Sequence, residues 1–102
     1  MFRYYKLDGK IPVPMDDVRA WAAWLEKADR RVANTHVGDL RVSTVFLGLD
    51  HSFGESREPM IFETMIFGMD DDSYQIRSST WELALEEHEK AVTVARERAQ
   101  LG

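Results

Sequence analysis

The amino-acid sequence predicts a single α+β domain over residues 1–102, with an antiparallel sheet of four to five strands and two amphipathic helices packed on one face. Three observations lead to this prediction. Two segments carry apolar residues at helical spacing, several short segments are rich in β-branched and aromatic residues, and turn signals separate them. The expected order is β-α-β-β-β-β-α, in which helices on one face of an antiparallel sheet are the natural packing.

The first strand is expected at residues 2–6, which are aromatic and alternate loosely, and a turn signal follows at residues 8–10. Residues 11–14 read Ile-Pro-Val-Pro. Proline has no N–H to donate to a sheet, so this segment is expected to be an edge or a connector.

The first helix is expected to open at Asp16 and Asp17 and to run to about Arg30, because carboxylates stabilise helix N-termini. Its apolar stripe comprises Val18, Trp21, Trp24, Leu25 and Ala28. The second helix is expected to begin at Ser79, in a capping box with Glu82. Its stripe comprises Trp81, Ala84, His88, Ala91, Ala95 and Ala99, and we expect His88 to be packed and hydrogen-bonded there.

Between the helices, residues 32–37 and 40–49 predict a hairpin around Gly38-Asp39, where glycine in the first loop position suits a type II′ turn. Residues 60–67 predict another strand, residues 68–73 a hairpin loop, and residues 74–78 the last strand.

Composition narrows the function classes. The chain has no cysteine, which excludes disulfides and zinc–cysteine sites, and its N-terminus lacks the apolar region of a signal peptide. No segment approaches the length of a membrane span. The net charge of −5 argues against nucleic acid and anionic membranes as partners. We therefore expect a cytoplasmic protein without a membrane partner.

Two segments are distinctive: RVSTVFLGLDH at Arg41–His51 and PMIFETMIFG at Pro59–Gly68. Together with Met1–Pro14 and the helix that contains Trp21, they resemble a group of small uncharacterised proteins encoded by tailed phages and prophages. The similarity covers most of the chain. It implies a phage or prophage origin, and hence the cytoplasm of a host cell, but it implies no activity and no site residues.

The loop Asp50–Glu55 has the most reactive side chains, because His51 titrates near neutral pH and Asp50 or Glu63 could orient it. No nucleophile, oxyanion donor or metal motif surrounds it, and the simpler interpretation is a solvated turn in which Asp50 binds backbone amides. The three histidines lack metal-ligand spacing, and Asp70–Asp72 lacks the pattern of a calcium loop. We predict no cofactor, no metal and no catalytic residue.

Strand alternation sorts the remaining residues onto two faces. One face, expected to be the core, carries Val42, Thr44, Phe46, Phe62, Thr64, Ile66, Tyr74 and Ile76. The other carries Arg41, Ser43, Val45, Leu47, Ile61, Glu63, Met65, Phe67, Gln75 and Arg77. This second face is either an interaction surface or is covered by the N-terminal strand and loops, and Glu63 on it would need a partner such as Arg41 or Arg77.

We therefore predict a non-catalytic binding module that covers a surface of a second copy or of a host protein, with a homo-oligomer expected. The predicted binding residues are Arg41, Val45, Leu47, Asp50, His51, Glu63, Met65, Phe67 and Arg77. Combined with the phage resemblance, this implies an accessory or anti-defence role. The alternatives are a small hydrolase-like enzyme and a small-ligand-sequestering protein, each with a site at the Asp50–Glu55 loop.

Overall fold

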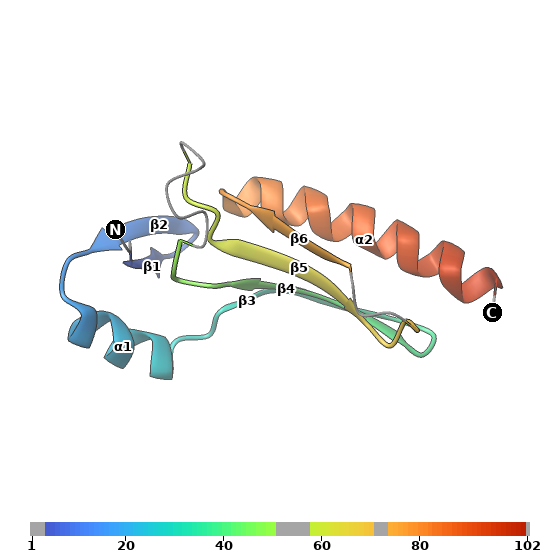
Figure 1. Cartoon of the computed structure of the whole chain (residues 1–102), viewed down its shortest axis with the longest axis horizontal. Coiled ribbons are helices and arrows are strands. Elements are labelled where there is room, and N and C mark those ends of the chain that lie inside the picture. Colours follow the sequence, from blue (N-terminus) through green and yellow to red (C-terminus); the bar gives the residue numbers. More distant parts are fainter. Residues whose placement is uncertain (1–3, 51–57, 71–73, 102) are drawn as a thin grey trace.

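The computed structural model describes residues 4–50, 58–70 and 74–101, and it confirms the α+β class (Figure 1). Its elements are β1 (Tyr4–Asp8), β2 (Ile11–Met15), α1 (Val18–Lys27), β3 (Arg31–Val37), β4 (Leu40–Phe46), β5 (Phe62–Phe67), β6 (Gln75–Ser78) and α2 (Trp81–Leu101). Strands β3, β4, β5 and β6 form a four-stranded antiparallel sheet in that order, and β1 and β2 form a separate two-stranded antiparallel sheet.

The order is β-β-α-β-β-β-β-α, which has one strand more than the sequence predicts. The additional strand is β2, which contains Pro12 and Pro14 and pairs with β1 from Asp8↔Ile11 to Tyr4↔Met15. The two prolines are two residues apart, so their nitrogens lie on the same side of β2. In the described part of the chain β2 pairs only with β1, so its other side has no neighbouring strand. Both missing N–H groups are tolerated on that free side.

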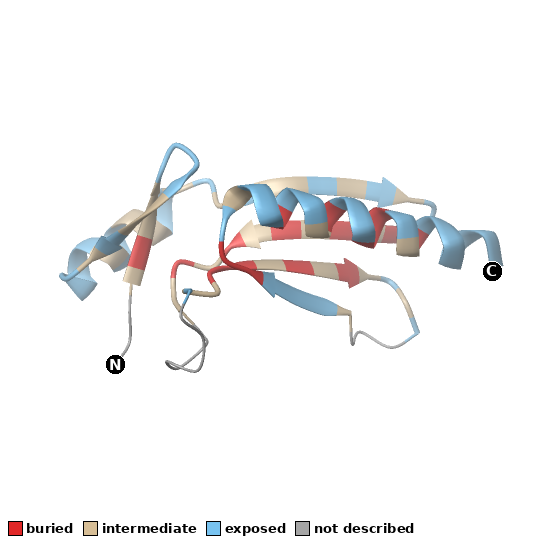
Figure 2. Ribbon diagram, turned by 90° about the horizontal axis from the view of Figure 1, so that it is seen from above, coloured by how far each residue is buried: buried red, intermediate tan, exposed pale blue. Residues whose placement is uncertain are grey.

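Helix α2 covers one face of the four-stranded sheet along its length (Figure 2). Its buried residues are Ala84, His88, Ala91, Val92 and Ala95, so three alanines let the helix backbone approach the strands closely. They pack on the buried residues of β4 and β5, which include Val42, Phe46, Phe62 and Ile66. The predicted assignment of these side chains to the core face is confirmed. Ile76 is the exception, because it lies on the edge strand β6 and is 37% exposed.

Helix α1 does not share that face, contrary to the expectation that both helices pack there. It contacts β1 and β2, and none of its residues is buried. It also ends at Lys27 rather than near Arg30, because the backbone of Ala28 has an extended conformation. This ten-residue helix is about 15 Å long, and its contacts are with the N-terminal strands β1 and β2.

The N-terminal unit of β1, β2 and α1 joins the large sheet at Gly48. The amide of Tyr5 donates to the carbonyl oxygen of Gly48 at 2.8 Å, and the indole Nε1 of Trp21 donates to the carbonyl oxygen of Tyr5 at 3.0 Å. Gly48 has φ of +79°, and a Cβ placed there would lie 3.1 Å from both Leu25 Cδ1 and Trp21 Nε1. Glycine therefore permits both the backbone conformation and the close approach.

Both helix N-termini are capped by side chains. Asp17 Oδ1 accepts from the amides of Arg19 and Ala20, as the sequence predicts. The cap of α2 is Thr80, whose Oγ1 accepts from the amide of Leu83 at 3.1 Å. The prediction that Ser79 caps this helix is wrong, because its hydroxyl donates instead to Glu58 Oε2 at 2.8 Å.

Replacement of Gly48 should test the joint between the two units. We expect Gly48→Ala to lower the free energy of unfolding by more than the ~1 kcal/mol typical of alanine at positive φ, because the methyl group also meets Leu25 and Trp21. Gly9→Ala is the matched control, since Gly9 also has positive φ but no atom within 4 Å of the added Cβ. Urea denaturation of both variants measures the difference, and equal losses would contradict the close packing.

The cap of α2 gives a second test. Thr80→Ala should lower the free energy of unfolding by about 1 kcal/mol, because the amide of Leu83 loses its acceptor. Thr80→Ser retains the hydroxyl and should leave the chemical denaturation midpoint close to that of the native chain. A midpoint unchanged by Thr80→Ala would show that the helix is capped in another way.

Candidate functional site

The face of the four-stranded sheet opposite α2 is the candidate functional surface. We call it the open face, and it consists of Asn34, His36, Arg41, Ser43, Val45, Glu63, Met65, Phe67, Gln75 and Arg77. On the central strands these side chains are half-buried by one another, and no described helix lies over them (Figure 1). The structure thus brings together six of the nine predicted binding residues: Arg41, Val45, Glu63, Met65, Phe67 and Arg77.

Glu63 has the partner that its position on this face requires. Arg77 Nε lies 3.2 Å from Glu63 Oε2, and the two residues are directly opposite on β5 and β6. The side chain of Glu63 is only 12% exposed, whereas that of Arg77 is 39% exposed. The arginine therefore shields a carboxylate that would otherwise be costly to hold among apolar neighbours.

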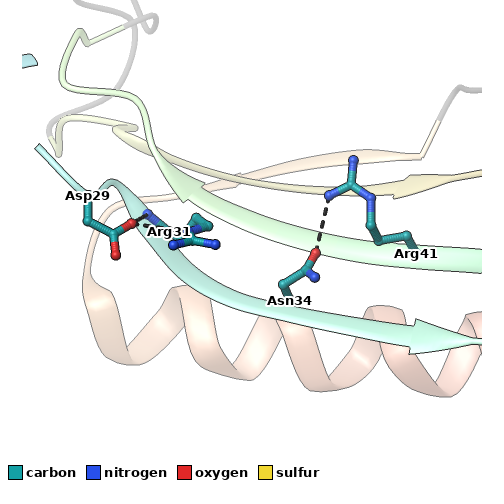
Figure 3. A network of polar contacts seen from close by, with 4 residues as sticks. All are labelled: Asp29, Arg31, Asn34 and Arg41. Atoms are coloured by element: carbon teal, nitrogen blue, oxygen red, sulfur yellow. Dashed lines mark hydrogen bonds and ion pairs between the residues drawn. The ribbon is translucent and has the colours of Figure 1, made fainter. Parts of the chain in front are cut away.

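Arg41 is held in place without a carboxylate. Its Nη1 donates to Asn34 Oδ1 at 3.1 Å (Figure 3). Its guanidinium lies over the ring of Phe67, 4.5 Å from the centroid. Within the described residues, no acidic side chain forms an ion pair with Arg41. The open face therefore presents a positive charge that is oriented by an amide and an aromatic ring, with further N–H donors to offer.

The end of this face nearest the N-terminal unit is covered. Ile61, predicted to lie on the second face, is fully buried in a cluster that includes Tyr5 and Phe46. Leu47 follows β4 and is half-buried, with its amide bonded to the carbonyl oxygen of Ile61. The N-terminal unit therefore covers this end, as one of the two alternatives predicts, and no described helix covers the rest of the face.

A pocket of about 290 Å³ adjoins the open face at the junction of α1 and β3. It is lined by Ala28, Asp29, Arg30, Arg31 and Val45. Asp29 Oδ1 accepts from Arg31 Nε at 3.2 Å, and this bond lowers the pKa of Asp29 (Figure 3). Both side chains are well exposed, so the pair orients the rim of the face and adds little stability.

The predicted alternative site at Asp50–Glu55 is described only in part. Asp50 Oδ1 accepts from the amide of Met60 at 3.2 Å, which matches the turn interpretation in which this carboxylate binds backbone. His51 lies outside the described residues, as do the other loop residues up to 57. Glu63, the second candidate to orient His51, is engaged by Arg77.

A second pocket lies away from the open face. This pocket of about 530 Å³ lies among the β3–β4 turn, the chain after β5 and the end of α2, lined in part by Asp39, Asp70 and Arg98. Within residues 4–50, 58–70 and 74–101, no three His, Asp or Glu side chains come together in a way that could hold a metal ion.

His88 forms the polar centre of the interface between α2 and the sheet. Its Nε2 lies 2.9 Å from Thr35 Oγ1, and its Nδ1 lies 2.8 Å from Thr44 Oγ1, which in turn contacts Thr64 Oγ1 at 2.7 Å. The side chain is 2% exposed, and burial lowers its pKa while Glu89 opposes this effect. The expectation of a packed, hydrogen-bonded histidine is confirmed.

Comparison of the chain with protein-family models, with curated proteins and with solved structures found no match. No described helix has both the length and the apolar character needed to cross a membrane.

The His88 network should make stability depend on pH. A histidine with a lowered pKa binds its proton more weakly when folded than when unfolded, so stability is complete above the ordinary value of 6.5 and falls as the pH drops below it. The loss should not exceed about 1.4 kcal/mol for each pH unit.

The measurement is the free energy of unfolding at about pH 7.5 and about pH 5.5, compared between the native chain and His88→Gln. The other histidines remain in both proteins, so the difference in pH dependence isolates His88. Equal pH dependence in the two proteins would contradict the assignment.

Proposed function

We propose that this protein is a non-catalytic accessory protein that acts by binding a protein surface through the open face. The observation that supports this most directly is the uncovered centre of that face. Val45, Met65 and Phe67 lie there on the two central strands, beside Arg41 and the Glu63–Arg77 ion pair, and no described helix covers them. An uncovered apolar centre with a polar rim is typical of interaction surfaces.

The charges favour a protein over a nucleic acid or an anionic membrane. The open face carries Arg41 and Arg77 against Glu63, and its rim carries Arg30 and Arg31, of which Arg31 pairs with Asp29. On a chain of net charge −5, Arg41 is the one arginine of the open face outside the ion pairs of the described residues, and a single guanidinium is too little to neutralise a polyphosphate. It suits one carboxylate on a protein partner.

The biological setting follows from the sequence resemblance. The likeness of Arg41–His51 and Pro59–Gly68 to phage and prophage proteins supports an accessory or anti-defence role in the cytoplasm of a host cell. In that setting the domain would act by occluding a host protein or by assembling with itself.

Substitutions on the open face should separate this function from the enzyme alternative. Met65→Asp should strongly reduce binding, because its carboxylate would be buried against the partner without a counter-charge. Leu47→Glu should weaken binding as well. His51→Ala should leave binding and biological effect largely unchanged.

The measurement is co-purification of tagged variants from the native host, with mass spectrometry of bound proteins and small molecules. Thr93→Asp, on the exposed side of α2, is the matched control for added charge. Circular dichroism checks that each variant is folded. Loss of function in His51→Ala together with full function in Met65→Asp would reject the binding module in favour of an enzyme.

A further inference from the structure

We propose that a second copy of this chain occupies the open face, packed face to face about a two-fold axis that crosses the strands along one row of side chains. That row is Asn34–Ser43–Met65–Gln75. The inference deepens the function proposed above and rests on it, because it names the partner and the register of the same surface.

The strand register divides the open face into three rows. The central row contains only neutral side chains. On one side of it lies the row His36–Arg41–Phe67, and on the other side lies the row Arg31–Val45–Glu63–Arg77. The unpaired positive charge and the carboxylate therefore lie on opposite sides of a neutral strip.

Sheets that pack face to face keep their strand directions within about 30° of each other, at a separation of about 10 Å. A two-fold axis in the interface must then run either roughly along the strands or roughly across them. In both cases the interface is isologous, so each contact occurs twice.

An axis along the strands, between β4 and β5, is unfavourable. It keeps every row opposite the same row of the other copy, so Arg41 lies near the partner's Arg41. It also places Arg77 of β6 opposite the partner's Arg31 of β3. Both contacts bring like charges together.

An axis across the strands, along the central row, avoids placing each outer row opposite its own copy. Each outer row then faces the opposite outer row. Arg41 of β4 lies opposite the partner's Val45, one strand from the partner's Glu63 and one strand from the partner's Arg31, whose charge is offset by its own ion pair with Asp29. The Glu63 carboxylate has room to contact Arg41, because only its Oε2 is engaged by Arg77. Met65 and Ser43 meet their own copies on the axis, which places no charge there.

The size of the face sets the expected affinity. Four strands spaced about 4.8 Å apart, the longest of seven residues, make a patch smaller than the roughly 800 Å² per partner of a standard stable interface, in the range of weak, transient complexes. We therefore expect dissociation in roughly the micromolar range, which sedimentation can measure.

Two charge-reversal variants test this register. The first is Arg41→Glu, and the second is Glu63→Arg combined with Arg77→Glu, which keeps an opposite-charge pair between positions 63 and 77. Each variant alone would set like charges against each other twice in the dimer. Mixed together, they restore two opposite-charge contacts.

Sedimentation equilibrium of the native chain, of each variant and of the equimolar mixture gives the result. We expect each variant alone to associate roughly tenfold more weakly than the native chain, and the mixture to recover most of the native affinity. Circular dichroism confirms folding. Recovery in the mixture cannot arise from a general loss of stability.

A single-cysteine variant gives an independent readout, because the chain has no cysteine of its own. Ser43→Cys lies on the proposed axis and should be joined to its own copy by a short bis-maleimide reagent. Thr93→Cys, on the exposed side of α2, should not be joined.

The outcomes separate this inference from the proposed function. If the native chain stays monomeric up to about 1 mM, the second copy is excluded, and co-purification with Met65→Asp still decides the proposed function. If Met65→Asp dissociates the dimer but charge reversal has no effect, the open face is the dimer interface and the proposed two-fold axis across the strands is rejected. If Met65→Asp leaves the dimer intact, the dimer does not use the open face.

Discussion

The structure depends on one constraint: a single helix covers a four-stranded sheet, and it can cover only one face. Helix α2 provides this cover through small side chains, with Ala84, Ala91 and Ala95 buried against the strands. At the middle of the contact, His88 bonds hydroxyls from two strands with its two ring nitrogens. Because all of these polar atoms find partners, the network fixes where the helix lies on the sheet at little cost in desolvation.

The N-terminal unit extends the molecule at one end of the large sheet and does not cover the second face of that sheet. It attaches to the end of β4 at Gly48, and its aromatic residues extend the core at that end, where Trp24 packs edge-on to Phe46. This arrangement buries Ile61 but leaves the rest of the open face beyond its reach. The uncovered surface is thus a direct consequence of how the two helices are divided between the two sheets.

The open face combines features that are costly to maintain without a use. An arginine is oriented over Phe67 by Asn34, a carboxylate is kept half-buried beside Arg77, and Met65 lies between them in a row of neutral side chains. Each contact fixes a side chain that would otherwise be free to move, and such preorganisation lowers the entropy lost on binding. The neutral central row gives the face a symmetry that a second copy can match.

The sequence by itself determined five of the six described strands, the hairpin around Gly38-Asp39, both helices and the division of β4 and β5 into two faces, because periodicity records which side of an element is buried. It also indicated that Glu63 would pair with an arginine and that His88 would be packed. It could not decide that Ile11–Met15 forms a strand, that Thr80 rather than Ser79 caps α2, or that α1 leaves the large sheet. The strand Ile11–Met15 pairs with its neighbour in the chain, but its two prolines argue against a strand. The cap of α2 and the place of α1 depend on contacts between residues far apart in the chain, such as Ser79 with Glu58 and Tyr5 with Gly48, and only the tertiary structure brings such residues together.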